Sequence, residues 1–180
     1  MSGENDVPEV DDAVIFPEGV GNVLVYLDKE SLLARLTADQ RSVRKQVVVD
    51  RFFELSSERA YYATDTYVVA EVVSAFRSKR GAQAAVELYD DIKRSDLAVQ
   101  HGGDPWESHN LSKSPRRVLD AAAAFIAGYP KHDVSLQEAL LVLQAKRGND
   151  WLFSFDGPLR TLGRACGLTV LPFTDRAYLG

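Results

Sequence analysis

The stretch GNVLVYLDKESLLARL, residues 21–36, decides the fold because two kinds of periodicity follow one another in it. Its first part is a short apolar run with β-branched residues that ends at Asp28, which is typical of a buried strand. After Asp28, the residues Leu32, Leu33 and Leu36 recur at helical spacing. The stretch therefore predicts a strand followed directly by a helix.

The rest of the chain continues this alternation. The apolar runs RAYYAT, WLFSF and LTVLPF predict strands, at residues 59–64, 151–155 and 168–173. Helical patterns fill most of the intervals, over residues 41–55, 64–81, 82–99, 116–129, 135–148 and 158–167. Such alternation is typical of a mostly parallel sheet with helices on both faces. We therefore predict an α/β fold, a three-layer α/β/α sandwich around a central, mostly parallel sheet.

The 180 residues divide into an acidic N-terminal tail, residues 1–20, and one domain over residues 21–180 that contains a long loop at about 101–115. The tail holds six acids and no Lys or Arg, and it dominates the net charge of −5. The domain contains the remaining 20 acids and all 21 Lys and Arg residues, so its own net charge is close to neutral. A polyanionic partner such as RNA is therefore not excluded.

No apolar run approaches the roughly 18 residues of a membrane span. The N-terminus also lacks the basic start and apolar stretch of a secretory signal. We expect a soluble, cytoplasmic protein without a membrane partner.

Two acids, Asp28 and Asp156, each follow an apolar strand. In a parallel sheet, ligands bind outside the carboxyl ends of the strands, which is where both residues are expected to lie. Each also has a structural interpretation. Asp28 is a good cap for the helix that follows it, and Asp156 is a good turn former before Gly157 and Pro158.

Two further acids, Glu71 and Glu138, lie in predicted helices. Glu71 is flanked by valines and alanines, and a carboxylate in apolar surroundings must be paired, protonated or bound to a cation. The alternative is that Glu71 lies in a narrow solvent-facing strip with Ser74 and Arg77, three and six positions further on. Glu138 follows Ser135 in an S-x-x-E pattern, which predicts a capping box that competes with metal binding if the side chain folds back.

The order of these acids in an α/β chain resembles the PIN domain, a family of nucleases. The segments that carry the resemblance are VLVYLDKESLL, TYVVAEVVSAF, and EALLVLQAKRGNDWLFSFDGPL continuing to GLTVLPF, which together extend over roughly residues 22–173. The resemblance implies that Asp28, Glu71, Glu138 and Asp156 hold Mg²⁺ or Mn²⁺ and are catalytic. It further implies that Ser154, at the S/T-x-D position, supports the site by hydrogen bonding.

Two positions depart from the family pattern. Where the family commonly has Asn two positions after the first Asp, this chain has Glu30, which could perturb or join the site. At the position of Glu138 the family commonly has Asp. Both substitutions keep oxygen ligands, and the long 101–115 loop is where we expect substrate choice to lie.

The resemblance implies a metal-dependent endoribonuclease that hydrolyses RNA phosphodiester bonds. The commonest role in the family is the toxin of a toxin–antitoxin pair, which implies a small antitoxin partner and a homodimer. Candidate substrate-binding residues are the cations at two helix ends, Arg77, Lys79 and Arg80 in one and Arg116 and Arg117 in the other. One alternative is a catalytically weak or inactive PIN-like scaffold. Another is a small phosphatase, which would need a second Asp where Glu30 stands.

Overall fold

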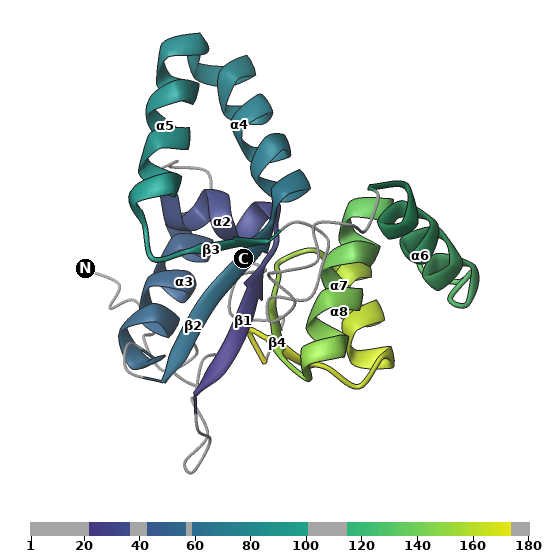
Figure 1. Cartoon of the computed structure of the whole chain (residues 1–180). Helices are drawn as coiled ribbons and strands as arrows, with labels where there is room; N and C mark the ends of the chain where they lie inside the picture. Colours follow the sequence, from purple (N-terminus) through teal and green to yellow (C-terminus); the bar gives the residue numbers. More distant parts are fainter. Residues whose placement is uncertain (1–21, 37–42, 57–58, 101–114, 174–180) are drawn as a thin grey trace, which may run out of the picture.

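A computed structural model describes residues 22–36, 43–56, 59–100 and 115–173. Its centre is a five-stranded sheet in the order β3-β2-β1-β4-β5, and every neighbouring pair of strands is parallel. The strands are β1 (Val23–Leu27), β2 (Ala60–Asp65), β3 (Ala98–Gln100), β4 (Trp151–Phe153) and β5 (Thr169–Leu171), and Figure 1 shows their arrangement. The predicted parallel sheet is confirmed. The acidic tail and the 101–114 segment lie outside the described residues.

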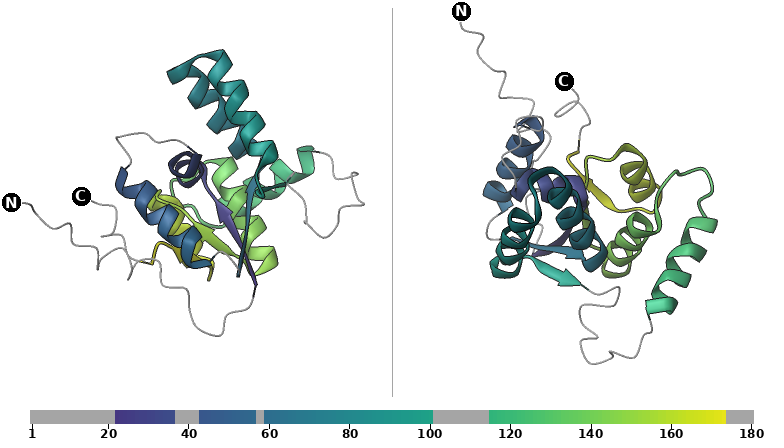
Figure 2. Two further views of the ribbon diagram at one scale, coloured as in Figure 1. Left: turned by 90° about the vertical axis from the view of Figure 1, so that its left-hand side faces the viewer. Right: turned by 90° about the horizontal axis from the view of Figure 1, so that it is seen from above.

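Helices cover both faces of the sheet. They are α2 (Lys29–Leu36), α3 (Val43–Ser56), α4 (Thr66–Arg80), α5 (Ala82–Arg94), α6 (Pro115–Ala127), α7 (Leu136–Gly148) and α8 (Gly157–Ala165). The helices α2 to α5 lie on one side of the sheet and α6 to α8 on the other, as the view from above in Figure 2 shows. The predicted three-layer α/β/α sandwich is therefore confirmed. Figure 1 also shows α4 and α5 projecting as a pair beyond the sheet.

The core forms because the strands of the central sheet are apolar on both sides, as expected where helices cover both faces. Tyr26 and Leu27 of β1 and Leu152 and Phe153 of β4 are almost fully buried. Phe52 of α3 packs on Phe153 with a ring-centroid distance of 5.1 Å. A second, smaller cluster joins α6 to α7.

The prediction that the helix starting at residue 82 continues to residue 99 is wrong at its C-terminal end. The helix α5 stops at Arg94, where the Ser95 backbone N–H donates to the carbonyls of Asp91 and Ile92. The chain then forms β3, which the sequence pattern did not predict. This short strand is stabilised by parallel pairing with β2, a non-local interaction that overrides local helical periodicity.

Register determines which residues meet at the carboxyl edge of the sheet. Leu27, the last residue of β1, pairs with Phe153, the last residue of β4. The residues that follow them, Asp28 and Ser154, therefore leave the sheet side by side.

Gly163→Val in α8 should lower the free energy of unfolding by about 1–3 kcal/mol, because added side-chain atoms overpack the core. A Cβ at Gly163 would lie 2.9 Å from Val170 Cγ2 and 3.1 Å from Leu152 Cδ2. Urea unfolding measures the change. Gly157→Val in the same helix is the control, since nothing lies within 4 Å of its Cβ position. Equal stability of the two variants would show that this α8–sheet contact is not tight.

Candidate active site

Asp28 is held at the carboxyl end of β1 by two hydrogen bonds. The Ser154 hydroxyl donates to Asp28 Oδ2 at 2.5 Å, and the Ser31 backbone N–H donates to Oδ1 at 2.7 Å. The second bond is the one an N-cap makes, so the capping interpretation of Asp28 is confirmed. It does not exclude a second role, because a carboxylate has about four lone-pair positions.

Burial dominates the electrostatics of Asp28. The residue is 4% exposed, and desolvation raises the pKa of its carboxyl from 3.8 to about 6. The hydrogen bonds from Ser154 and Ser31 lower the pKa in part, and the nearby charge of Glu30 raises it further. A carboxylate in this position is therefore stabilised by any cation that approaches it.

Ser154 also joins Asp28 to Asp156. Its hydroxyl oxygen accepts the backbone N–H of Asp156 at 3.0 Å while its proton goes to Asp28. Asp156 caps α8, accepting the Leu159 backbone N–H at 2.8 Å on Oδ1. The hydrogen bonding predicted for Ser154 is therefore present, although its part in catalysis stays a prediction.

Glu71 lies in the second turn of α4 and is half-buried. Its Oε1 forms an ion pair with Lys29 Nζ at 2.6 Å, and this pair connects α4 to α2. A carboxylate in apolar surroundings was expected to be paired, protonated or bound to a cation, and in the structure Glu71 is paired. Glu30, the departure from the family pattern, pairs with Lys45 Nζ at 2.5 Å.

Glu138 folds back onto its own helix. The Ser135 backbone N–H donates to Glu138 Oε2 at 2.6 Å, and the Ser135 hydroxyl accepts the Glu138 backbone N–H at 3.2 Å. The capping box predicted from the S-x-x-E pattern is therefore confirmed. Because α7 leads into β4, its first turn still lies at the carboxyl edge of the sheet, on the same side as Asp28.

Asp28, Glu71, Glu138 and Asp156, together called the acidic edge below, fit Mg²⁺ or Mn²⁺ in donor chemistry, since hard cations prefer carboxylate oxygens. Their side chains are not assembled as a metal centre. Within the part of the chain that the structure describes, no three His, Cys, Asp or Glu side chains form a group that could hold a metal ion. The reason is that Glu71 and Glu138 are turned towards Lys29 and Ser135. Their roles as ligands stay predictions.

Sequence reasoning missed several residues at this edge. Asp65, buried at the end of β2, caps α4 and accepts Gln144 Nε2 of α7 at 2.8 Å. Arg160 is buried in α8 and donates to the carbonyls of Ser154, Leu171 and Pro172. Of these contacts, only the N-cap of α4 had a local signal in the sequence, which is the polar run at residues 64–66. The other partners are brought together by the tertiary fold.

The predicted substrate-binding cations lie elsewhere. Arg77, Lys79 and Arg80 are exposed in the last turn of α4. By the rise of a helix, Arg80 is roughly 14 Å along α4 from Glu71. Arg116 and Arg117 begin α6, and their side chains lie outside the described residues. Contact between either group and RNA stays a prediction.

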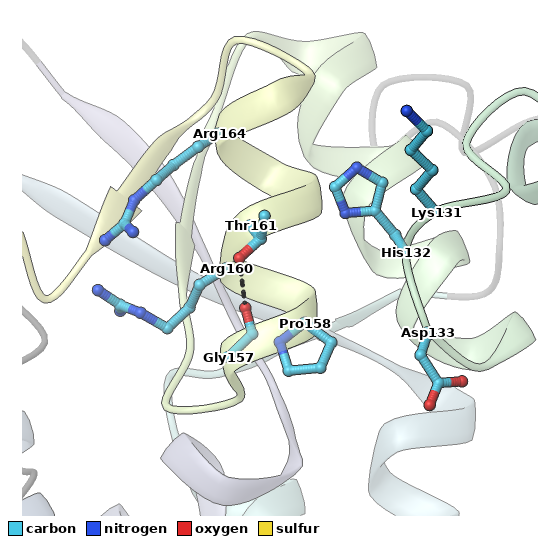
Figure 3. Close-up of a pocket in the computed structure, with 8 residues that line it drawn as sticks. All are labelled: Lys131, His132, Asp133, Gly157, Pro158, Arg160, Thr161 and Arg164. Carbon is cyan, nitrogen blue, oxygen red and sulfur yellow. Dashed lines mark hydrogen bonds between the residues drawn. The ribbon is translucent and has the colours of Figure 1, made fainter.

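A groove of about 420 Å³ lies between α8 and the connection from α6 to α7. Its lining residues are Lys131, His132, Asp133, Gly157, Pro158, Arg160, Thr161 and Arg164. Figure 3 shows His132 facing α8, whereas the side chains of Arg160 and Arg164 extend on the other side of that helix. Since none of the acidic edge lines this groove, it is separate from the predicted metal site.

Comparison with solved structures identifies the fold. The crystal structure of VapC20 from Mycobacterium tuberculosis, described as a Sarcin-Ricin loop cleaving toxin, aligns with a TM-score of 0.56 and 15% identity, over 77% of this chain and 95% of VapC20. FitAcB from Neisseria gonorrhoeae aligns with a TM-score of 0.51 and 11% identity, over 83% of this chain and 98% of the other. No family model and no curated protein matches the sequence. The chain has a PIN-like fold, as predicted.

None of the described helices is long and apolar enough to cross a membrane.

Asp28→Asn should raise the free energy of unfolding at pH 7 in metal-free buffer by up to about 3 kcal/mol. The pKa of the carboxyl is about 6 in the folded chain and 3.8 ordinarily, so the folded state binds the proton more tightly. The contribution of Asp28 to wild-type stability therefore falls as pH rises from about 4 to about 6, and the variant lacks this loss. Urea unfolding at several pH values between about 4 and 7, with EDTA, measures the difference.

The comparison has an internal control. Burial also raises the pKa of Asp150 to about 6, and this effect is the same in both proteins. The difference between them therefore isolates Asp28. A difference that does not change with pH would contradict the raised pKa.

Proposed function

We propose that the chain is a divalent-metal-dependent endoribonuclease that hydrolyses RNA phosphodiester bonds and acts as the toxin of a toxin–antitoxin pair. The observation that carries the proposal is the buried Asp28 carboxylate, linked through Ser154 to Asp156 at the carboxyl edge of a PIN-like sheet. A buried carboxylate with a raised pKa at a ligand-binding edge is typical of a functional site. VapC20, which shares the fold, is described as a Sarcin-Ricin loop cleaving toxin.

In this proposal Asp28, Glu71, Glu138 and Asp156 would hold Mg²⁺ or Mn²⁺. When bound, the metal supplies an activated water and stabilises the charge that develops on the phosphate and the leaving oxygen. Ser154 holds the carboxylate of Asp28 in place by its hydrogen bond, and burial of Asp28 excludes competing water. Glu138, once turned away from Ser135, is either a ligand or the base that accepts the proton of the attacking water on Oε2.

We also propose a small antitoxin protein as partner, a homodimer as the assembly and the cytoplasm as the location. Each rests on the likeness in fold to toxins and on the RNA substrate. The candidate RNA contacts are the exposed cations of α4, Arg77, Lys79 and Arg80, and the start of α6.

A second candidate is a PIN-like scaffold with little or no catalysis. The ion pair between Glu71 and Lys29 favours it, because this pair already satisfies one of the proposed ligands. Metal binding separates the two candidates. An active site should be stabilised against heat by Mn²⁺ through mass action, and a scaffold should not.

The purified full-length chain should cleave structured RNA in the presence of Mn²⁺. Asp28→Asn and Asp156→Asn should each lower the cleavage rate by about 100-fold or more, the scale expected when a positioned catalytic group is lost. Gel analysis of labelled RNA measures the rate, and EDTA should abolish it. Cleavage that persists in EDTA or in Asp28→Asn would overturn the proposed site.

Glu138→Gln separates capping from catalysis, because Gln at this position also completes a capping box. We expect the free energy of unfolding to be unchanged, whereas Mn²⁺ affinity and cleavage both fall. Ser135→Ala is the matched control. It should cost about 1 kcal/mol of stability by removing the cap while leaving the Glu138 carboxylate available. If Glu138→Gln cleaves RNA as well as wild type, Glu138 is a cap only.

A further inference from the structure

Lys29 occupies an unusual position for a cation. It is the first residue of α2 and directly follows Asp28. Its ammonium nitrogen lies 2.6 Å from Glu71 Oε1. The ammonium group therefore contacts one carboxylate of the acidic edge, and Lys29 directly follows a second member of that edge, Asp28, in the chain.

A second ion pair on the same helix provides a comparison. Arg35, on the same helix, pairs with Asp50 at 3.1 Å, and the side chains of that pair are 46% and 45% exposed. The side chains of Lys29 and Glu71 are 41% and 39% exposed. A single pair this exposed contributes little to stability. What distinguishes Lys29 is its place, because its ammonium group contacts a carboxylate to which the proposed function assigns metal binding.

We propose that Lys29 is the resident counter-ion of Glu71 in the acidic edge, and that its ammonium group competes with a divalent cation for this carboxylate. Lys29 then sets the metal affinity of the site. The inference rests on the proposed metal-dependent function and adds that a side chain of the protein, Lys29, competes with the metal ion for Glu71. A metal ion at Glu71 Oε1 would repel the ammonium group, because both carry positive charge, so the two compete for this oxygen.

Calorimetric titration of the full-length chain with Mn²⁺ alone tests the proposal. Lys29→Met keeps much of the aliphatic stem and removes the charge, so it should bind Mn²⁺ roughly 10-fold more tightly than wild type. Arg35→Met is the control, since it removes one positive charge from the same helix and breaks a similarly exposed pair. It should leave the affinity close to that of wild type. Equal affinities of Lys29→Met and wild type would overturn the proposal, as would equal gains in the two variants.

A double-mutant cycle provides a second readout that does not depend on cleavage. Lys29→Met and Glu71→Gln should show a non-additive effect on the melting temperature in EDTA, because the two side chains interact directly. In saturating Mn²⁺ the coupling should disappear, since the metal has replaced the ammonium. A coupling of equal size in both conditions would contradict displacement.

The outcomes also separate this inference from the proposed function. If wild type binds Mn²⁺ and cleaves RNA while Lys29→Met binds no more tightly, only the role of Lys29 is wrong. If neither wild type nor Lys29→Met binds Mn²⁺, the metal-dependent function and the inference are both wrong.

Discussion

The hydrogen bond from the Ser154 hydroxyl to Asp28 joins the ends of two central strands, and the geometry of the carboxyl edge depends on it. A carboxylate that is almost fully buried is costly unless donors satisfy it. Ser154 provides one donor, and the first turn of α2 provides the other through the backbone of Ser31. The same serine oxygen accepts the backbone N–H of Asp156, so one side chain contacts both strand-end residues.

Much of the fold could be predicted because its signals are local. The apolar run before Asp28 and the helical spacing after it are readable within sixteen residues, and the same holds for β4 and α8. The strand β3 was missed because its three residues acquire their conformation from pairing with β2. The order of the strands also depends on which distant segments pair, which periodicity does not encode.

The site was predictable to the same extent. The strand-end positions of Asp28 and Asp156 and the capping box of Glu138 have sequence signals within a few residues. The partner of Glu71 had none, because Lys29 is 42 positions away and meets it only through the packing of α2 on α4. The contact between Asp65 and Gln144 is more distant still in sequence, at 79 positions. Which carboxylate faces which partner is therefore a property of tertiary packing.

The edge strand β5 has a consequence for behaviour at high protein concentration. An unpaired strand edge can recruit a strand from another copy and begin aggregation. The carbonyl oxygen of Leu171 points inward, where it accepts the Ser154 backbone N–H. The next carbonyl oxygen, that of Pro172, is bound by the guanidinium of Arg160, and Pro172 has no backbone N–H to donate. The strand has only three residues, so little backbone remains for an incoming chain. The arginine that fixes the end of the sheet thus also protects this edge against self-association through added strands.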